Sequence, residues 1–159
     1  QTIRQKFEEL WGTTLDPNPG LTVVEIMDAI HAGKLHGCYI MGENPAMSDP
    51  DANHAREALA KLEHLVVQDI FLTETAYFAD VVLPASAFPE KTGTFTNTDR
   101  QVQLGRQAIN PPGDARQDLW IIQQMANGMG LDWHYDGPDS GVAVVRAETI
   151  RLSAFAPLP

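Results

Sequence analysis

Residues 65–84 read LVVQDIFLTETAYFADVVLP, a segment in which two short apolar runs flank a more polar stretch. The runs at 65–67 and 81–83 have the length and the β-branched content of strands buried in a parallel sheet. Pro84 ends the second run, because proline cannot donate a hydrogen bond to a neighbouring strand. The segment therefore predicts two buried strands, with polar residues at the tip of the first.

A third strand and two helices precede this segment. Residues 37–41, an apolar run bounded by glycines, predict a strand that is buried on both faces. Thr22 suits the N-cap of a helix that stops near Gly33, and residues 48–64 open with capping residues and continue with good helix formers. Strand, helix and strand in this order form a right-handed parallel crossover. The predicted fold class is α/β, with a Rossmann-like parallel sheet flanked by helices.

The segments around this region are less regular. Residues 2–11 predict an amphipathic helix, and two prolines and a glycine follow it. A short helical piece is expected near 75–78, and an extended loop follows the third strand, with a short strand through Val102 and Leu104. The expected parts of the chain are an N-terminal helix and linker at 1–20, an α/β domain at 21–137, and a tail without interpretable pattern at 138–159.

A last helix is predicted after the two prolines and the glycine at 111–113. Asp114 suits its cap, and Gly130 marks its end. An acidic residue in the first turn, such as Asp118, is favoured by the helix dipole. The apolar residues on one predicted face are Leu119, Ile122, Met125, Ala126 and Met129.

Composition excludes several classes of function. The 159 residues carry a net charge of −10, and the 11 basic residues are scattered, so nucleic acid is not expected as a partner. No apolar run approaches the roughly 20 residues of a membrane segment, and no export signal is visible, so a cytoplasmic location is expected. The one cysteine, Cys38, rules out an internal disulfide or a multi-thiolate metal site, and its apolar neighbours are typical of a buried side chain.

Three loops should meet at the carboxyl edge of the sheet, where open α/β sheets bind their ligands. They span residues 42–45, 68–75 and 84–97. A carboxylate at the end of a buried strand, such as Asp69, needs a partner, because an unpaired buried charge costs several kcal/mol. Guanine offers two adjacent N–H donors to a carboxylate, and the Gln68 amide can add a contact. The pattern favours a purine site.

Each candidate residue also has a simpler structural role. Asn44 before Pro45 is a common turn pair, and Asp69 can cap a following helix. Lys91 follows an acidic neighbour, as in a solvated surface pair. Asp118 is explained by the helix dipole alone. Taken singly, the structural role is the more common for every one of them.

The motifs of this region are far more specific as an ordered set than singly. In chain order they are GENP at 42–45, VVQD at 66–69, TETAYFADVVLP at 73–84, PEKTGTFTN at 89–97 and a D-x-W at 118–120. Over roughly residues 20–137 the chain resembles molybdopterin-guanine-dinucleotide oxidoreductases, with formate dehydrogenase alpha subunits the most similar. By that resemblance, the residues that contact the cofactor nucleotide are Asn44, Gln68, Asp69, Lys91 and Asp118.

The resemblance implies molybdopterin guanine dinucleotide, with molybdenum or tungsten, as the cofactor. It also implies an internal, non-catalytic fragment of a parent enzyme that oxidises formate to carbon dioxide and carries its iron–sulfur clusters elsewhere. The implied partners are the remaining domains of that enzyme and its electron-transfer subunits. One departure is that family members often carry two adjacent arginines after the T-N motif, whereas this chain has Arg100 followed by Gln101.

Two other interpretations stay open at the level of sequence. The large peripheral subunit of NADH:quinone oxidoreductase is similar in fold but holds no molybdopterin, which would make this a structural domain. The presence of Asn44, Asp69, Lys91 and Asp118 argues against that role. The second is another substrate, such as nitrate, on the same cofactor scaffold, because the residues that select the substrate belong to other domains.

Overall fold

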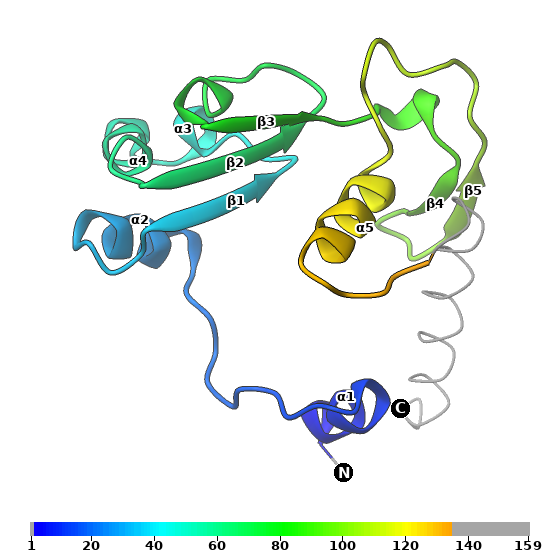
Figure 1. Cartoon of the computed structure of the whole chain (residues 1–159), viewed down its shortest axis with the longest axis horizontal. Helices are drawn as coiled ribbons and strands as arrows, with labels where there is room; N and C mark the ends of the chain where they lie inside the picture. The colour runs from blue at the N-terminus through cyan, green and yellow to red at the C-terminus, as the bar shows by residue number, and fades with distance from the viewer. Residues whose placement is uncertain (1, 135–159) are drawn as a thin grey trace.

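A computed structural model describes residues 2–134, and a three-stranded parallel sheet organises the first half of the chain (Figure 1). Its strands are β1 (Gly37–Met41), β2 (His64–Asp69) and β3 (Val81–Pro84), in the order β1-β2-β3. Both pairings are parallel, as the crossover pattern predicts. The α/β class and the positions of the expected strands are confirmed, but the expectation that the run at 81–83 is buried is wrong, since Val81 and Val82 are 40% and 38% exposed.

One face of the sheet carries the main core. α3 (Pro45–Ser48), α4 (Ala52–Leu59) and the 3-10 turn η1 (Ala76–Phe78) pack on it. Alternate residues of β1 and β2 contribute, because successive side chains of a strand point to opposite faces. Burying an aliphatic side chain of this core contributes roughly 1.5–3 kcal/mol. Its buried members are Ile40, Ala46, Leu59, Leu65, Val67 and Ala76.

Helix α2 (Val23–His31) packs on α4 and closes a second, smaller core. Met27 and Ile30 of α2 are buried together with Ala55 and Ala58 of α4. The two alanines let the helices approach closely, because their side chains occupy little space between the helix axes. The expected helix after Thr22 is therefore confirmed.

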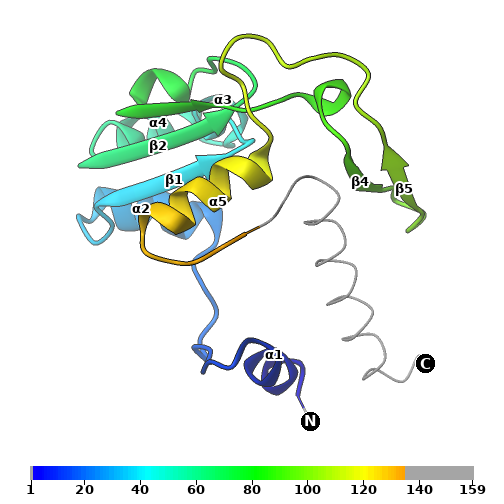
Figure 2. The ribbon, with the colours of Figure 1, turned by 45° about the vertical axis from the view of Figure 1, so that its right-hand side comes forward.

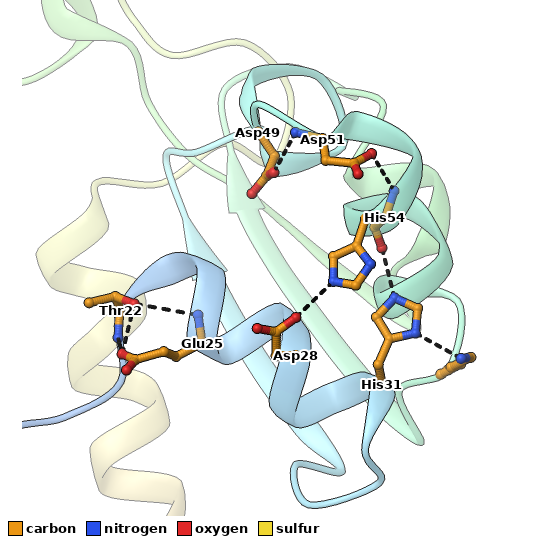
Figure 3. A network of polar contacts seen from close by, with 8 residues as sticks. Thr22, Glu25, Asp28, His31, Asp49, Asp51 and His54 are labelled. Atoms are coloured by element: carbon orange, nitrogen blue, oxygen red, sulfur yellow. Dashed lines mark hydrogen bonds and ion pairs between the residues drawn. The ribbon is translucent and has the colours of Figure 1, made fainter.

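A set of polar contacts also ties α2 to α4 (Figure 3). His54 Nε2 lies 3.1 Å from Asp28 Oδ1, and His31 Nε2 lies 3.0 Å from the carbonyl oxygen of His54. The two imidazole rings stack with their centroids 4.1 Å apart, and Lys61 Nζ lies 2.8 Å from His31 Nδ1. Because a lysine ammonium only donates, His31 carries its proton on Nε2. We call Asp28, His31, His54 and Lys61 the histidine clasp.

Helix α2 begins at the cap that the sequence indicates. The Thr22 hydroxyl accepts a hydrogen bond from Glu25 N at 3.4 Å, and Glu25 Oε2 accepts one from Thr22 N at 2.7 Å (Figure 3). This capping box satisfies N–H groups that the first helical turn leaves unpaired. The hydrogen bonds from the backbone and side chain of Thr22 also hold the pKa of Glu25 below its usual value.

A hairpin and a helix follow the sheet. β4 (Gly93–Thr96) and β5 (Val102–Gly105) pair antiparallel, whereas the sequence predicted loop at the first of these strands. α5 (Asp118–Gly128) then returns to the sheet and lies near its carboxyl edge, where the arrowheads point in Figures 1 and 2. This return brings residues far apart in the sequence to the tips of the strands.

The expectation that the strand at 37–41 is buried on both faces is wrong. Ile40 is buried, but Tyr39 and Met41 are 39% and 47% exposed. Among residues 2–134, the core residues of α3 and α4 pack against the face of β1 that carries Ile40. The side chains of Tyr39 and Met41 point to the opposite face. A cavity of about 450 Å³ beside β1 and α2 is lined in part by Tyr39 and Met41.

The last helix begins later than the sequence predicts. Its N-cap is Gln117 rather than Asp114, and the Gln117 side chain makes no capping hydrogen bond. The reason is a short backbone bridge: Arg116 N donates to the Pro84 carbonyl at 3.0 Å, and Ser86 N donates to the Arg116 carbonyl at 2.8 Å. This bridge keeps the chain extended up to the helix and aligns the start of α5 with the end of β3.

Other helix details also differ from the predictions. Ile121 and Ala126 are the buried residues of α5, whereas Met129, which the pattern assigned to the apolar face, is 75% exposed. α3 is a helical turn where the sequence predicted only a turn pair. α4 ends at Leu59 rather than near residue 64, because His64 already pairs with Gly37 in the sheet.

Helix α1 (Ile3–Trp11) stands apart from the sheet region in both views (Figures 1 and 2). It is the amphipathic helix expected at 2–11, and none of its residues is buried. No helix among residues 2–134 is both long and apolar enough to cross a membrane. The tail expected at 138–159 lies outside the described residues.

Candidate functional site

The carboxyl ends of the three strands meet at one edge of the sheet. Met41 pairs with Gln68, and Asp69 pairs with Pro84. The loop after β1 is tied to β2, where Gly42 N donates to the Gln68 carbonyl at 2.9 Å. The polar residues that follow β1 and β2 therefore lie at the same edge, as the parallel arrangement predicts.

Four hydrogen-bonded side chains run across this edge from β1 to the loop before β4. The Tyr39 hydroxyl donates to Gln68 Oε1, and Gln68 Nε2 donates to Asp118 Oδ1 at 2.8 Å. Lys91 Nζ forms an ion pair with the other carboxylate oxygen, Asp118 Oδ2. We call Tyr39, Gln68, Asp118 and Lys91 the polar chain. It brings together three of the residues that the sequence singled out.

Each bond of the polar chain has only one workable direction. A carboxylate only accepts, so the Gln68 atom that faces Asp118 must be the amide nitrogen. The amide oxygen then faces Tyr39, whose hydroxyl must donate. Gln68 is fully buried, so water does not replace these partners. The bonds to Asp118 have a charged acceptor, which makes them stronger than bonds between neutral groups.

Lys91 and Asp118 do not have the simple surface roles considered for them. The Lys91 side chain is 21% exposed and that of Asp118 is 32% exposed, and the two pair with each other. Glu90 instead accepts a hydrogen bond from Ala87 N at 2.8 Å, within a 3-10 turn. Asp118 uses both carboxylate oxygens for Gln68 and Lys91, so its main effect is to hold those two side chains in place.

Asn44 ties the loop after β1 to the segment after β2. Its Oδ1 accepts from Thr75 N at 3.1 Å and from Thr75 Oγ1 at 2.7 Å, and its Nδ2 donates to Glu74 Oε2 at 2.7 Å. Thr75 Oγ1 in turn accepts from Ala46 N at 3.1 Å. Asn44 is thus a structural link between two of the converging loops, and it keeps one amide hydrogen without a partner among the described residues.

Asp69 shapes the turn that follows β2. Its Oδ1 accepts from Ile70 N at 2.7 Å and from Phe71 N at 3.2 Å. Such a turn uses only one side of the carboxylate. Within residues 2–134, no hydrogen bond to the second oxygen, Oδ2, is present, so that oxygen can accept from a ligand.

A further polar group lies just after β3. Ser86 is 1% exposed, and its Oγ has no hydrogen-bond partner within the described part of the chain. A buried hydroxyl without a partner costs about 1–3 kcal/mol, so it indicates a missing contact. Its backbone is fixed by the bridge to Arg116, which places Ser86 between the end of β3 and the start of α5.

Sequence reasoning missed Tyr39, Glu74 and Ser86. Tyr39 stands within the apolar run of β1, and Ser86 stands between two alanines, so neither carries a polar pattern. Glu74 gave a weak signal, since it lies in the TETA motif. The hydrogen bond from Asn44 is the main cause that holds the pKa of Glu74 below its usual value.

Burial affects two other titratable groups on β1. The pKa of Tyr39 is raised, first by burial and second by the nearby negative charge of Asp118. The pKa of the Cys38 thiol is raised by burial, so the thiol stays protonated near neutral pH. Cys38 packs against the main core as a small apolar side chain, but it is half-buried rather than buried as expected. No group of three or more metal-ligating side chains lies together among residues 2–134.

Comparisons with known proteins agree with this architecture. A family model described as molybdopterin oxidoreductase matches residues 4–128. The "F420-dependent formate dehydrogenase subunit alpha" of Methanocaldococcus jannaschii is 58% identical over 125 residues, which cover 78% of this chain and 18% of that subunit. The "Probable oxidoreductase YjgC" of Bacillus subtilis is 44% identical over 153 residues, which cover 96% of this chain and 15% of that protein. The chain thus spans only a small part of each relative.

A solved structure shares the fold. Acetylene hydratase from Pelobacter acetylenicus superposes with a TM-score of 0.66 over 87% of this chain and 20% of that enzyme. The two sequences are 21% identical over this region, so the likeness concerns the fold alone.

Proposed function

Because the chain belongs to the molybdopterin oxidoreductase family, we propose that its α/β domain, residues 21–137, holds the guanine end of molybdopterin guanine dinucleotide. The domain is then one part of a longer formate dehydrogenase, which oxidises formate to carbon dioxide. Support comes from relatives named as formate dehydrogenases, of which the chain spans 18% and 14%.

The observation that carries the proposal is the buried polar chain at the carboxyl edge of the sheet. An amide as deeply buried as Gln68 has a desolvation cost that its hydrogen bonds with Tyr39 and Asp118 must offset. Its position at the strand tip is where parallel α/β sheets bind nucleotides. A costly polar network at that point supports a binding role.

The residues at this edge fit a guanine base. Asp69 Oδ2 can accept hydrogen bonds from the ring N–H and the exocyclic amine of guanine. Gln68 is fully buried, so it supports this edge through Asp118, to which its Nε2 donates, rather than by touching a ligand. Ser86 Oγ is a buried hydroxyl that a ligand atom can satisfy. This edge of the sheet therefore offers hydrogen-bonding groups for both the donors and the acceptors of a purine base.

The residues of this chain bind and orient the cofactor. Asn44 offers its remaining amide hydrogen, and Lys91 offers a cation suited to a phosphate. Asp118 orients Gln68 and Lys91. The bound cofactor supplies the redox chemistry at its molybdenum or tungsten. We place the metal ligands, the substrate-binding residues and the iron–sulfur clusters in other parts of the enzyme.

The partners in this proposal are those other parts of the enzyme and its electron-transfer subunits. The proposal keeps the cytoplasmic location that the sequence led us to expect. In this proposal, other parts of the enzyme determine which metal and which electron acceptor are used.

The proposal is tested in the full-length protein with Asp69→Asn. Asparagine keeps an oxygen for the turn at Ile70 and Phe71 but replaces the second acceptor with an NH2 donor. We expect the guanine nucleotide released on denaturation, per mole of protein, to fall about tenfold or more, because a charged hydrogen bond contributes roughly 1.5–3 kcal/mol.

The matched control is Asp114→Asn, an exposed carboxylate in the loop before α5. It should leave the guanine content unchanged. Wild-type guanine content in Asp69→Asn, or wild-type protein that contains no guanine nucleotide at all, would contradict the proposed function.

A further inference from the structure

We propose that Tyr39 is a positioning residue of the nucleotide site, which holds the Gln68 amide in the orientation that presents its nitrogen to Asp118. This inference rests on the proposed function, since it assigns a new residue to the same site. Tyr39 lies in an apolar run, outside the motifs on which the family resemblance depends.

The sheet register puts Tyr39 within reach of Gln68. Tyr39 pairs with Val66 of β2, and Gln68 is two residues further along that strand. Residues two apart on a strand face the same side of the sheet, so the tyrosine ring can reach diagonally to the amide. The Tyr39 hydroxyl then donates to Gln68 Oε1.

The amide needs this donor because Gln68 is fully buried. If the hydroxyl is removed, Oε1 becomes a buried acceptor without a partner. The side chain can satisfy it only by rotating, and rotation takes Nε2 away from Asp118. Asp118 would then lose one of its two hydrogen bonds, and Lys91, which pairs with the same carboxylate, would lose part of its support.

The surroundings of Tyr39 fit this role better than that of an ordinary core residue. The residue is 39% exposed, so tight packing does not explain why a large aromatic side chain stands there. Its hydroxyl nevertheless faces the protein, and the charge of Asp118 acts on it. Tyr77 provides the contrast, since it is 74% exposed and makes no hydrogen bond among the described residues.

The test uses full-length protein with Tyr39→Phe, which removes only the hydroxyl, and Tyr77→Phe as the matched control. The first readout is guanine nucleotide retained after dialysis, measured by chromatography of the denatured protein. Retention should fall about threefold or more in Tyr39→Phe and stay unchanged in Tyr77→Phe, in keeping with loss of one hydrogen bond. In a Gln68→Met background, Tyr39→Phe should have no further effect on retention.

The second readout needs no cofactor. Tyr39 and Lys91 are the two ends of the polar chain and share no hydrogen bond, so their effects on the urea midpoint should be additive unless the side chains between them couple them. We expect the urea midpoint of the Tyr39→Phe, Lys91→Met double variant to fall by clearly less than the sum of the decreases in the two single variants.

Three results would overturn the inference. They are equal losses of guanine with and without Gln68, additive urea midpoints, and a Tyr77→Phe effect as large as that of Tyr39→Phe. Wild-type protein without guanine would overturn the proposed function, and with it the nucleotide role of Tyr39. The urea midpoints of the single and double variants would then still show whether Tyr39 orders Gln68, so the two failures are distinguishable.

Discussion

The histidine clasp and the polar chain are both sets of four linked side chains, but they stand in different surroundings. The clasp joins two neighbouring helices and lies beside a small apolar core, with Asp28 65% and His54 36% exposed at the side chain. The polar chain joins four segments and passes through Gln68, which is completely buried.

The difference teaches how to separate a structural network from a functional one. Water can take over when a member of the clasp is lost, because its groups are near the surface. In the polar chain, loss of Tyr39 or Asp118 leaves the buried Gln68 amide without one of its partners, which costs more than the bond contributes. A buried network fixes the orientation of its side chains, and this one does so at the carboxyl edge of the sheet, where parallel α/β sheets bind ligands.

The largest expected effect comes from Gln68→Leu, which keeps the volume and removes the amide. Tyr39 loses its acceptor and Asp118 loses a donor, so the free energy of unfolding should fall by about 2–3 kcal/mol. Urea unfolding of the purified protein measures this loss, and guanine content should fall with it. A variant as stable as the wild type would mean that the polar chain adds nothing to the fold.

A smaller effect is expected when the clasp is broken by His31→Phe. Phenylalanine keeps an aromatic ring beside His54 but loses the hydrogen bonds to the His54 carbonyl and to Lys61. The free energy of unfolding should fall by about 0.5–1.5 kcal/mol, and guanine content should not change. Loss of guanine in this variant would remove the distinction between the two networks.

The sequence predicted the sheet better than it predicted the site, for a physical reason. The strands and α2 follow from local patterns, namely apolar runs, caps and crossover length. The contacts of Gln68 depend on Asp118, which lies 50 residues further along the chain, so no local pattern reports them. The resemblance to a family singled out Lys91 and Asp118, but it could not indicate that they pair with each other.

The same limit explains the errors. Tyr39 was read as one residue of an apolar run, because a tyrosine in a strand usually packs through its ring. The start of α5 was placed too early, because the bridge between Arg116 and the end of β3 is a tertiary contact. The hairpin at 93–105 was missed in part, because glycine and threonine occur in loops as well as in strands.

The smallest expected effect is a difference in the alkaline stability of wild type and Tyr39→Phe. Burial and the charge of Asp118 raise the pKa of Tyr39 above the ordinary value of about 10. The stabilising contribution of the neutral hydroxyl is therefore fully present below about pH 10, and it is lost as the pH rises through the higher folded-state value. The gap in urea midpoint between the two proteins should be constant from pH 7 to about pH 9 and should narrow above about pH 10. Tyr77→Phe should show no such narrowing, because the Tyr77 hydroxyl makes no hydrogen bond among residues 2–134 and the residue is exposed. A gap that persists unchanged at the alkaline end would mean that folding does not raise the pKa of the Tyr39 hydroxyl, which would contradict its burial beside the charge of Asp118.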